Sequence, residues 1–223
     1  PNGDIYIKKH MDGVIFAGEV DIRVIEEFRK QSIPVVLVNN YLDMDGLVCI
    51  SADHYGGAVQ ATEYLCKLGH CKIGLLSGRF SPQVSEARIE GFVKTLAKYD
   101  IPVDDRFIAD IEPALEDGEE IMTRMLRGVD RPTAFFCTND TIAAGAMKAV
   151  TRAGLRVPED IAIIGFDDSY ISRVVEPELT TVRIDAAKMG CLAMQTLFDL
   201  IAGMPVEKAH IQIPTELIVR GTA

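Results

Sequence analysis

Short, almost entirely apolar runs alternate along this chain with longer stretches whose apolar residues recur at helical spacing. Strands without polar alternation are typical of a parallel sheet that helices cover on both faces. The alternation therefore predicts doubly wound α/β lobes. The expected strands cover residues 14–17, 34–38, 48–51, 72–77, 107–109, 133–137, 161–166 and 182–184, followed by an extended tail over 209–219. The expected helices cover about 22–28, 55–68, 85–99, 117–126, 141–153 and 187–202.

Length and charge narrow the functions that are open to such a chain. Its 223 residues suffice for two packed lobes, and no apolar run approaches the roughly 20 residues that a membrane helix needs. The formal net charge is −10, whereas binding to DNA phosphates requires a surface rich in Lys and Arg. We therefore expect no membrane contact, and DNA contact only through another segment of a parent protein. The chain opens with Pro1 rather than Met, so we expect it to be a fragment.

The five cysteines form no C-x-x-C motif, and Cys49 and Cys137 lie inside apolar runs. We expect all five to be reduced structural thiols, which favours a cytoplasmic location. Cys66, His70 and Cys71 could be imagined as metal ligands, but a helix end with apolar neighbours accounts for them better. We expect no metal site and no cofactor.

Polar residues at the strand ends are the candidate site, because ligands of open parallel sheets bind beyond the carboxyl ends of the strands. If the predicted topology holds, these side chains gather at one edge. They are Asn39 and Asn40, Asp53, Asn139 and Asp140, Asp167 and Asp168, with Arg88 at the start of the helix that follows 72–77.

Arg88 is the most informative of these residues. We expect it in the first turn of its helix, where a cation opposes the helix dipole at a cost of about 0.3–1 kcal/mol. A partner such as Asp167 or a ligand oxygen would offset that cost. Its guanidinium would then clamp hydroxyls or a carboxylate. The alternative is a salt bridge to Glu90 or a solvated surface position.

Each of the other candidates has a ligand-binding and a structural interpretation. Asp167 would accept from ligand hydroxyls, or cap the following turn. Asn139 could donate and accept at once, which suits polyols and nucleobases, or it could be the N-cap of the helix that starts near Asp140. Asp53 is better explained as a helix cap, and Asn39 is either a ligand contact or a turn residue.

Signals for catalysis are weak. The chain has no G-x-S-x-G elbow, no H-E-x-x-H motif and no P-loop, and its four histidines are scattered. Asp167 and Asp168 resemble half of a phosphoacceptor pocket, but the lysine-bearing strand that such a pocket needs is not evident. We predict no catalytic residues and no enzyme, and keep a small α/β enzyme that uses these two carboxylates as an alternative.

Eight segments, in order along nearly the whole chain, resemble regulators of the LacI/GalR family. The strongest match runs from Gly154 to Asp168, where Val157-Pro158-Glu159-Asp160 precedes Gly165-Phe166-Asp167-Asp168. Each segment alone is weak evidence, but eight in the right order are specific. The other matching segments are 12–16, 33–38, 53–73, 88–92, 132–145, 177–182 and 214–220.

The resemblance implies two Rossmann-like parallel-sheet lobes joined by three crossovers, in a type I periplasmic-binding-protein-like arrangement. The first lobe would comprise 1–52 and 186–212, and the second 53–185 and 213–223. A small-molecule effector would bind between the lobes and change the geometry of a homodimer's DNA-binding headpieces. By motif position, the contact residues would be Arg88, Asn139 and Asp167 in the second lobe and Asn39 in the first.

Two departures from the family pattern qualify this picture. The helix-turn-helix headpiece and the start of the first lobe are absent, so that lobe is expected to be incomplete, with residues 14–17 at an exposed apolar edge. Ile111, Glu112 and Pro113 stand where relatives place an aromatic wall. Stacking on a sugar ring or base is therefore not expected there.

The resemblance favours the effector-binding part of a bacterial transcription regulator that senses a sugar or related polyol. The alternative is an extracytoplasmic sugar-binding protein that delivers its ligand to a transporter. The segments Val157-Pro158-Glu159-Asp160 and Leu179-Thr180-Thr181 resemble regulators, and five unpaired cysteines suit the cytoplasm better.

Overall fold

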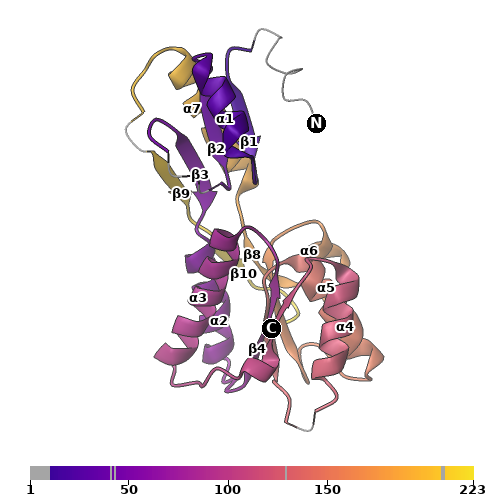
Figure 1. Cartoon of the computed structure of the whole chain (residues 1–223). Helices are drawn as coiled ribbons and strands as arrows, with labels where there is room; N and C mark the ends of the chain where they lie inside the picture. The colour runs from indigo at the N-terminus through magenta and orange to yellow at the C-terminus, as the bar shows by residue number, and fades with distance from the viewer. Residues whose placement is uncertain (1–10, 41, 43, 129, 207–208) are drawn as a thin grey trace. The chain divides into compact units, whose positions relative to one another are not determined.

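The computed structural model describes residues 11–40, 42, 44–128, 130–206 and 209–223 (Figure 1). Internal contacts divide the chain into unit 1, Pro1–Asp53 with Asp185–Ile213, and unit 2, His54–Ile184 with Pro214–Ala223. The chain passes from one unit to the other three times, and each passage lies within one residue of an expected lobe boundary. Residues 1–10 of the expected first lobe lie outside the described residues.

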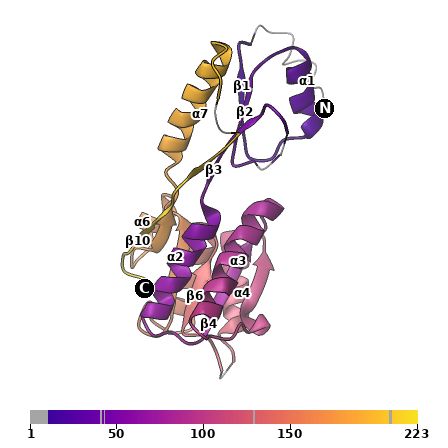
Figure 2. The same ribbon diagram turned by 90° about the vertical axis from the view of Figure 1, so that its left-hand side faces the viewer.

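Unit 1 is built around a parallel sheet with the strand order β1-β2-β3-β9. Helices α1 and α7 cover its two faces (Figure 2). Asp21 caps α1 by accepting from the backbone N–H of Arg23, and Ile25 and Phe28 bury its apolar face. The bounds are β1 (Val14–Ala17), α1 (Ile22–Lys30), β2 (Val35–Val38), β3 (Val48–Ala52), α7 (Ala186–Ile201) and β9 (His210–Ile213).

Unit 2 holds a larger sheet with the order β10-β8-β7-β6-β4-β5, in which only β10 runs antiparallel among the described strands. The order reverses at β4 and β6, because β5 lies on one side of β4 and all later strands on the other. The bounds are α2 (His54–Lys67), β4 (Ile73–Gly78), α3 (Pro82–Lys98), β5 (Ile108–Ile111), α4 (Leu115–Met125), β6 (Ala134–Cys137), α5 (Asp140–Arg152), β7 (Ala162–Asp167), α6 (Ile171–Val174), β8 (Thr180–Arg183) and β10 (Glu216–Ile218).

Two apolar cores sandwich the sheet of unit 2. Successive side chains of a strand point to opposite faces, so Phe135 of β6 joins the core under α4 and α5, and Phe136 joins the core under α2 and α3. Gly145 lets α5 approach α4, because a Cβ there would lie 2.1 Å from the carbonyl oxygen of Leu115. This double coverage explains why the strands carry so few polar residues, as the sequence indicated.

Three local features differ from expectation. α3 begins at Pro82 rather than near residue 85, because Pro82 occupies a first-turn position where its missing N–H is tolerated. The extended tail is two strands in different sheets, β9 before Pro214 and β10 after it. The short helix α6 was not expected. No helix among the described residues combines the length and the apolar character that crossing a bilayer requires.

Candidate functional site

Arg88 lies at the centre of the candidate site in unit 2. Arg88 is buried, with only 3% of its surface exposed. One guanidinium nitrogen donates to the carbonyl oxygen of Thr138, and the other lies 3.2 Å from Nδ1 of His54 and 3.3 Å from Oδ1 of Asp167. The suggested partner Asp167 is therefore confirmed. The alternative partner Glu90 pairs with Lys94 instead.

The position of Arg88 on α3 differs from the sequence prediction. Since α3 begins at Pro82, Arg88 lies in its second turn rather than its first. The dipole cost that we assigned to it was wrong, because that effect fades beyond the first turn. Its need for partners comes instead from burial, since an ionised group removed from water must be paired and hydrogen-bonded.

Two aromatic rings flank the guanidinium of Arg88. Its central carbon lies 3.9 Å from the ring centre of Phe166 and 4.9 Å from that of Phe80. Contact between a cation and an aromatic face is stronger where water is excluded. Phe166 comes from the end of β7 and Phe80 from the β4–α3 loop, so two segments distant in sequence hold one side chain. Sequence reasoning missed both rings.

Asp167 ends β7 in an unusual backbone conformation. Its φ is +107°, and Asp168 follows with φ +51°. Two consecutive non-glycine residues with positive φ store strain, which is common where a side chain must be aimed at a ligand. The side chain of Asp167 remains 37% exposed. It is the open carboxylate of this cluster.

The pKa of Asp167 is raised to about 6. Burial is the main cause, the charge of Arg88 opposes it, and the nearby carboxyl of Asp140 adds to it. Asp140 is the first residue of α5 and accepts from the backbone N–H of Ser169 at 2.6 Å and from Oγ1 of Thr181 at 2.5 Å. Burial raises the pKa of Asp140 as well.

Asn139 has the structural role that the sequence left open. It is the N-cap of α5, and its Oδ1 accepts from the backbone N–H of Ile142 at 2.8 Å. Within the described parts of the chain, the Nδ2 amide of Asn139 has no hydrogen-bond acceptor. Asn139 directly follows Thr138, whose carbonyl holds Arg88. The cap role fixes this amide near the guanidinium, and ligand donation stays a prediction.

His54 is a further residue of this cluster that sequence reasoning did not select. It opens α2, is 3% exposed, and lies against the ring of Phe166 with centroids 6.0 Å apart. Burial and the charge of Arg88 lower its pKa to about 3. The ring is therefore neutral at physiological pH, and Nδ1 can accept from Arg88.

Asp168 does not share the surroundings of Asp167. Its side chain is 2% exposed and accepts from Arg183 at 2.8 Å, from Arg220 at 2.5 Å and from Ser172 at 3.0 Å. Burial opposes its ionisation, but these hydrogen bonds outweigh it and lower the pKa to about 2. A carboxylate enclosed in this way cannot reach a substrate. The enzyme alternative that pairs Asp167 with Asp168 therefore loses one of its two groups.

Asn39 lies in unit 1, at the end of β2. Its φ is +50°, and its Oδ1 accepts from the backbone N–H of Ala52 at 3.3 Å. This left-handed turn matches the structural interpretation of the residue, because Asn tolerates that conformation better than most. Its predicted ligand contact remains a prediction.

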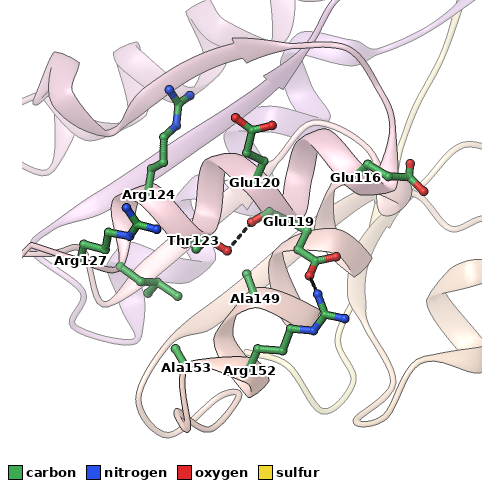
Figure 3. Close-up of a pocket in the computed structure, with 10 residues that line it drawn as sticks. Glu116, Glu119, Glu120, Thr123, Arg124, Arg127, Ala149, Arg152 and Ala153 are labelled. Carbon is green, nitrogen blue, oxygen red and sulfur yellow. Dashed lines mark hydrogen bonds and ion pairs between the residues drawn. The ribbon is translucent and has the colours of Figure 1, made fainter.

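A groove of about 800 Å³ lies elsewhere in unit 2, on the surface of α4 and α5. It contains none of the predicted site residues (Figure 3). Glu119 pairs there with Arg152 and with Lys148, in exposed contacts that contribute little to stability or specificity. The groove is lined by Glu116, Glu119, Glu120, Thr123, Arg124, Leu126, Arg127, Ala149, Arg152 and Ala153.

The structure thus brings three of the four predicted site residues together. Arg88 bonds to Asp167 and to the residue before Asn139, at the point where the strand order of unit 2 reverses. Open α/β sheets bind ligands at such a point. The cluster offers an open carboxylate acceptor, an amide donor and a buried cation. These groups suit hydrogen bonding to a polar ligand.

Residues 62–223 match the family model described as periplasmic binding protein-like domain. The chain is 34% identical over 221 residues to the probable HTH-type transcriptional repressor ExuR of Bacillus subtilis, covering 98% of this chain and 66% of that protein. It is 33% identical over 223 residues to the HTH-type transcriptional repressor PurR of Pasteurella multocida, covering 97% and 66%. The chain therefore spans just under two thirds of the length of these relatives.

Solved structures agree with this assignment. A regulatory protein of the LacI family from Chloroflexus aggregans has a TM-score of 0.87 and 30% identity, covering 95% of this chain and 76% of that chain. A LacI-family transcriptional regulator from Enterococcus faecium with bound ribose has a TM-score of 0.86 and 28% identity, covering 95% and 79%. These four relatives are repressors or regulators rather than enzymes. The chain belongs to the LacI family and carries its periplasmic binding protein-like domain.

Proposed function

We propose that this chain is the effector-sensing part of a bacterial transcription regulator and has no enzymatic activity. The observation that supports this proposal most directly is the buried cluster around Arg88. Arg88 bonds there to Asp167 and to Thr138, the residue before Asn139, at the point where the strand order of unit 2 reverses. The repressor relatives supply the biological context. Because repressors act on DNA, we place the parent protein in the cytoplasm.

The effector is a small polar metabolite, most simply a sugar or related polyol. Asp167 accepts from its hydroxyls, and the Nδ2 amide of Asn139 donates to its oxygens. Arg88 holds Asp167 through the contact of 3.3 Å and is bonded to the residue before Asn139. Bound ribose in the Enterococcus faecium relative favours this class. Asn39 is the contact that we propose from the first lobe.

Coupling to DNA requires parts of the parent protein beyond this chain. The net charge of −10 makes the chain itself a poor partner for phosphates, so operator binding belongs to a helix-turn-helix headpiece. Effector binding shifts the equilibrium between two conformations of the protein, and this shift changes the geometry of the DNA-binding headpieces of a dimer.

The α4–α5 surface supports the homodimer that this coupling needs. Glu116 and Glu120 lie in the first half of α4, and Arg124 and Arg127 lie at or just beyond its end. No ion pair involves these four side chains in the described part of the chain. Two copies of α4 running antiparallel across a twofold axis place each carboxylate opposite a guanidinium of the other copy.

Charge reversal tests this interface. Converting Arg124 and Arg127 together to Glu should produce monomers in sedimentation velocity at micromolar concentration. Converting Glu116 and Glu120 to Arg in the same chain restores self-complementarity and should restore the dimer. A quadruple variant that stays monomeric would contradict this interface, and a double variant that stays dimeric would place it elsewhere.

An extracytoplasmic sugar-binding protein remains the alternative. It would share the lobes and the ligand but would have no operator. The repressor relatives favour the regulator. A helix-turn-helix segment encoded ahead of this chain in the same gene would decide for the regulator, and a signal peptide would decide against it.

Effector binding tests the proposed site. A thermal-shift screen of sugars, polyols and nucleobases should find a ligand that raises the melting temperature, because a ligand selective for the folded state stabilises it. For that ligand, Arg88→Ala should weaken binding by about 1.5–3 kcal/mol, or roughly ten- to a hundredfold, in calorimetry. Arg79→Ala is the matched control, since Arg79 follows the same strand but pairs with Asp110 and Glu112 in exposed contacts. Unchanged affinity in Arg88→Ala would reject the site.

A further inference from the structure

The charge of Arg88 is balanced within the protein. Its polar contacts include the carbonyl of Thr138, Nδ1 of His54 and Oδ1 of Asp167. The carbonyl is uncharged, and the imidazole is neutral because burial lowers the pKa of His54 to about 3. Of these contacts, Asp167 is the charged one, and its carboxylate pairs with the guanidinium.

The other charged groups near Asp167 add no open cation. Asp140, on α5, is a buried carboxyl close enough to raise the pKa of Asp167. Arg183 lies opposite Asp167 in the β7–β8 register, and its Nε donates to Asp168 at 2.8 Å. The groups around Asp167 thus come from four elements. Arg88 on α3 is its cationic partner, and His54 on α2 is neutral. Asp140 on α5 is a carboxyl, and Arg183 on β8 is bonded to Asp168.

We propose that this site accepts uncharged, hydroxyl-rich effectors and rejects their carboxylate counterparts, with Asp167 as the residue that sets the selectivity. This inference rests on the proposed function and narrows its ligand class. A sugar hydroxyl donates to the carboxylate of Asp167 and accepts from Nδ2 of Asn139. A ligand carboxylate at the same place lies beside Asp167, and repulsion between like charges is strong where water is partly excluded.

The titration of Asp167 makes the two ligand classes respond to pH in opposite ways. Its pKa of about 6 places its change of charge within an accessible range. Lowering the pH through 6 removes the anionic acceptor for a sugar hydroxyl, so sugar affinity falls. The same change removes the repulsion of a uronate, so uronate affinity rises.

Matched ligand pairs provide the test. The full 223-residue chain is titrated in a calorimeter with glucose and glucuronate, with galactose and galacturonate, and with ribose alone, at pH 7.5 and pH 5.5. At pH 7.5 at least one sugar should bind at least about tenfold more tightly than its carboxylate partner, which corresponds to about 1.4 kcal/mol. Asp167→Asn should narrow that ratio to about threefold or less. Asp105→Asn removes the same charge in the 3-10 turn Asp105–Phe107, which precedes the edge strand β5, and should leave the ratio unchanged.

Each outcome decides one claim. A carboxylate that binds the wild-type chain as tightly as its sugar, or a ratio unchanged in Asp167→Asn, overturns this inference and leaves the proposed function standing. If none of these five ligands binds at concentrations up to 50 mM, the proposed sugar class is contradicted, and this inference with it. If Asp167→Asn does not fold, the wild-type pH series decides, because sugar and carboxylate affinities that move in the same direction between pH 7.5 and 5.5 overturn the inference.

Discussion

The region around Asp167 and the region around Asp168 can be compared directly, because one peptide bond separates the two carboxylates. Both residues have positive φ, and both side chains leave the end of the same strand. Asp167 has one cationic partner at 3.3 Å and a pKa raised to about 6. Asp168 has three arginines within 3.5 Å and a pKa lowered to about 2.

The difference shows that burial alone does not decide the charge state of a carboxylate. Asp168 is the more buried of the two by side-chain exposure, 2% against 37%. Its hydrogen bonds from Arg220, Arg183 and Ser172 nevertheless outweigh the cost of burial. Asp167 has fewer donors and a second carboxyl nearby. Asp168 is enclosed by its partners, whereas the side chain of Asp167 stays partly exposed.

Truncating Asp168 should have the largest effect on stability. Asp168→Ala removes the buried carboxylate that accepts from Arg220, Arg183 and Ser172. Breaking a buried ion pair in this way costs about 3–5 kcal/mol. Urea unfolding followed by circular dichroism measures the loss. Asp110→Ala, which breaks an exposed pair with Arg79, should change little, and equal losses in the two variants would refute the comparison.

The contribution of Asp168 should also depend on pH in a defined window. Because its pKa is lowered from 3.8 to about 2 in the folded chain, its stabilising effect is complete above pH 4 and is lost as the pH falls towards 2. The stability gap between the wild-type chain and Asp168→Asn should therefore stay constant from pH 7 to pH 5 and shrink below pH 4. A gap that already closes between pH 7 and pH 5 would assign the effect to another group.

Most of the fold could be predicted from the sequence, for a physical reason. Strands buried on both faces leave continuous apolar runs, and nearly every expected strand and helix is present within a few residues of its predicted bounds. The errors fall where a local signal was overlooked. Pro82, at the start of α3, was available as a helix-start signal, and Pro214 marked the break between β9 and β10.

The site was predicted only in outline. Strand ends pointed to Asp167 and Asn139, because topology alone brings such residues to one edge. The companions of Arg88 could not be predicted, since His54, Phe80 and Phe166 come from three segments whose meeting depends on packing. The one available hint was the aromatic residue at 166, directly before the candidate carboxylate.

Neutralising Asp167 should change the stability of the folded chain less than removing Asp168 does, and in the opposite direction. Its folded pKa is raised, so the folded chain binds more protons than the unfolded chain between pH 3.8 and about 6, and wild-type stability falls as the pH rises through that window. Asp167→Asn carries no charge there. It should melt slightly above the wild-type chain at pH 7.5, with the difference vanishing near pH 4, as measured by scanning calorimetry. A lower melting temperature at pH 7.5 would mean that Arg88 depends on the charge of Asp167 for stability.

Asp140→Asn should produce the smallest change, confined to the titration of its neighbour. Removing the negative charge behind Asp167 should move the pKa of Asp167 down from about 6 towards its ordinary value, while burial keeps it above 3.8. The carboxyl carbon shift of Asp167 in NMR measures this directly, and Asp105→Asn serves as the control for loss of a remote charge. If the pKa of Asp167 does not move, the charge of Asp140 does not contribute to the raised pKa, and burial is the cause that remains.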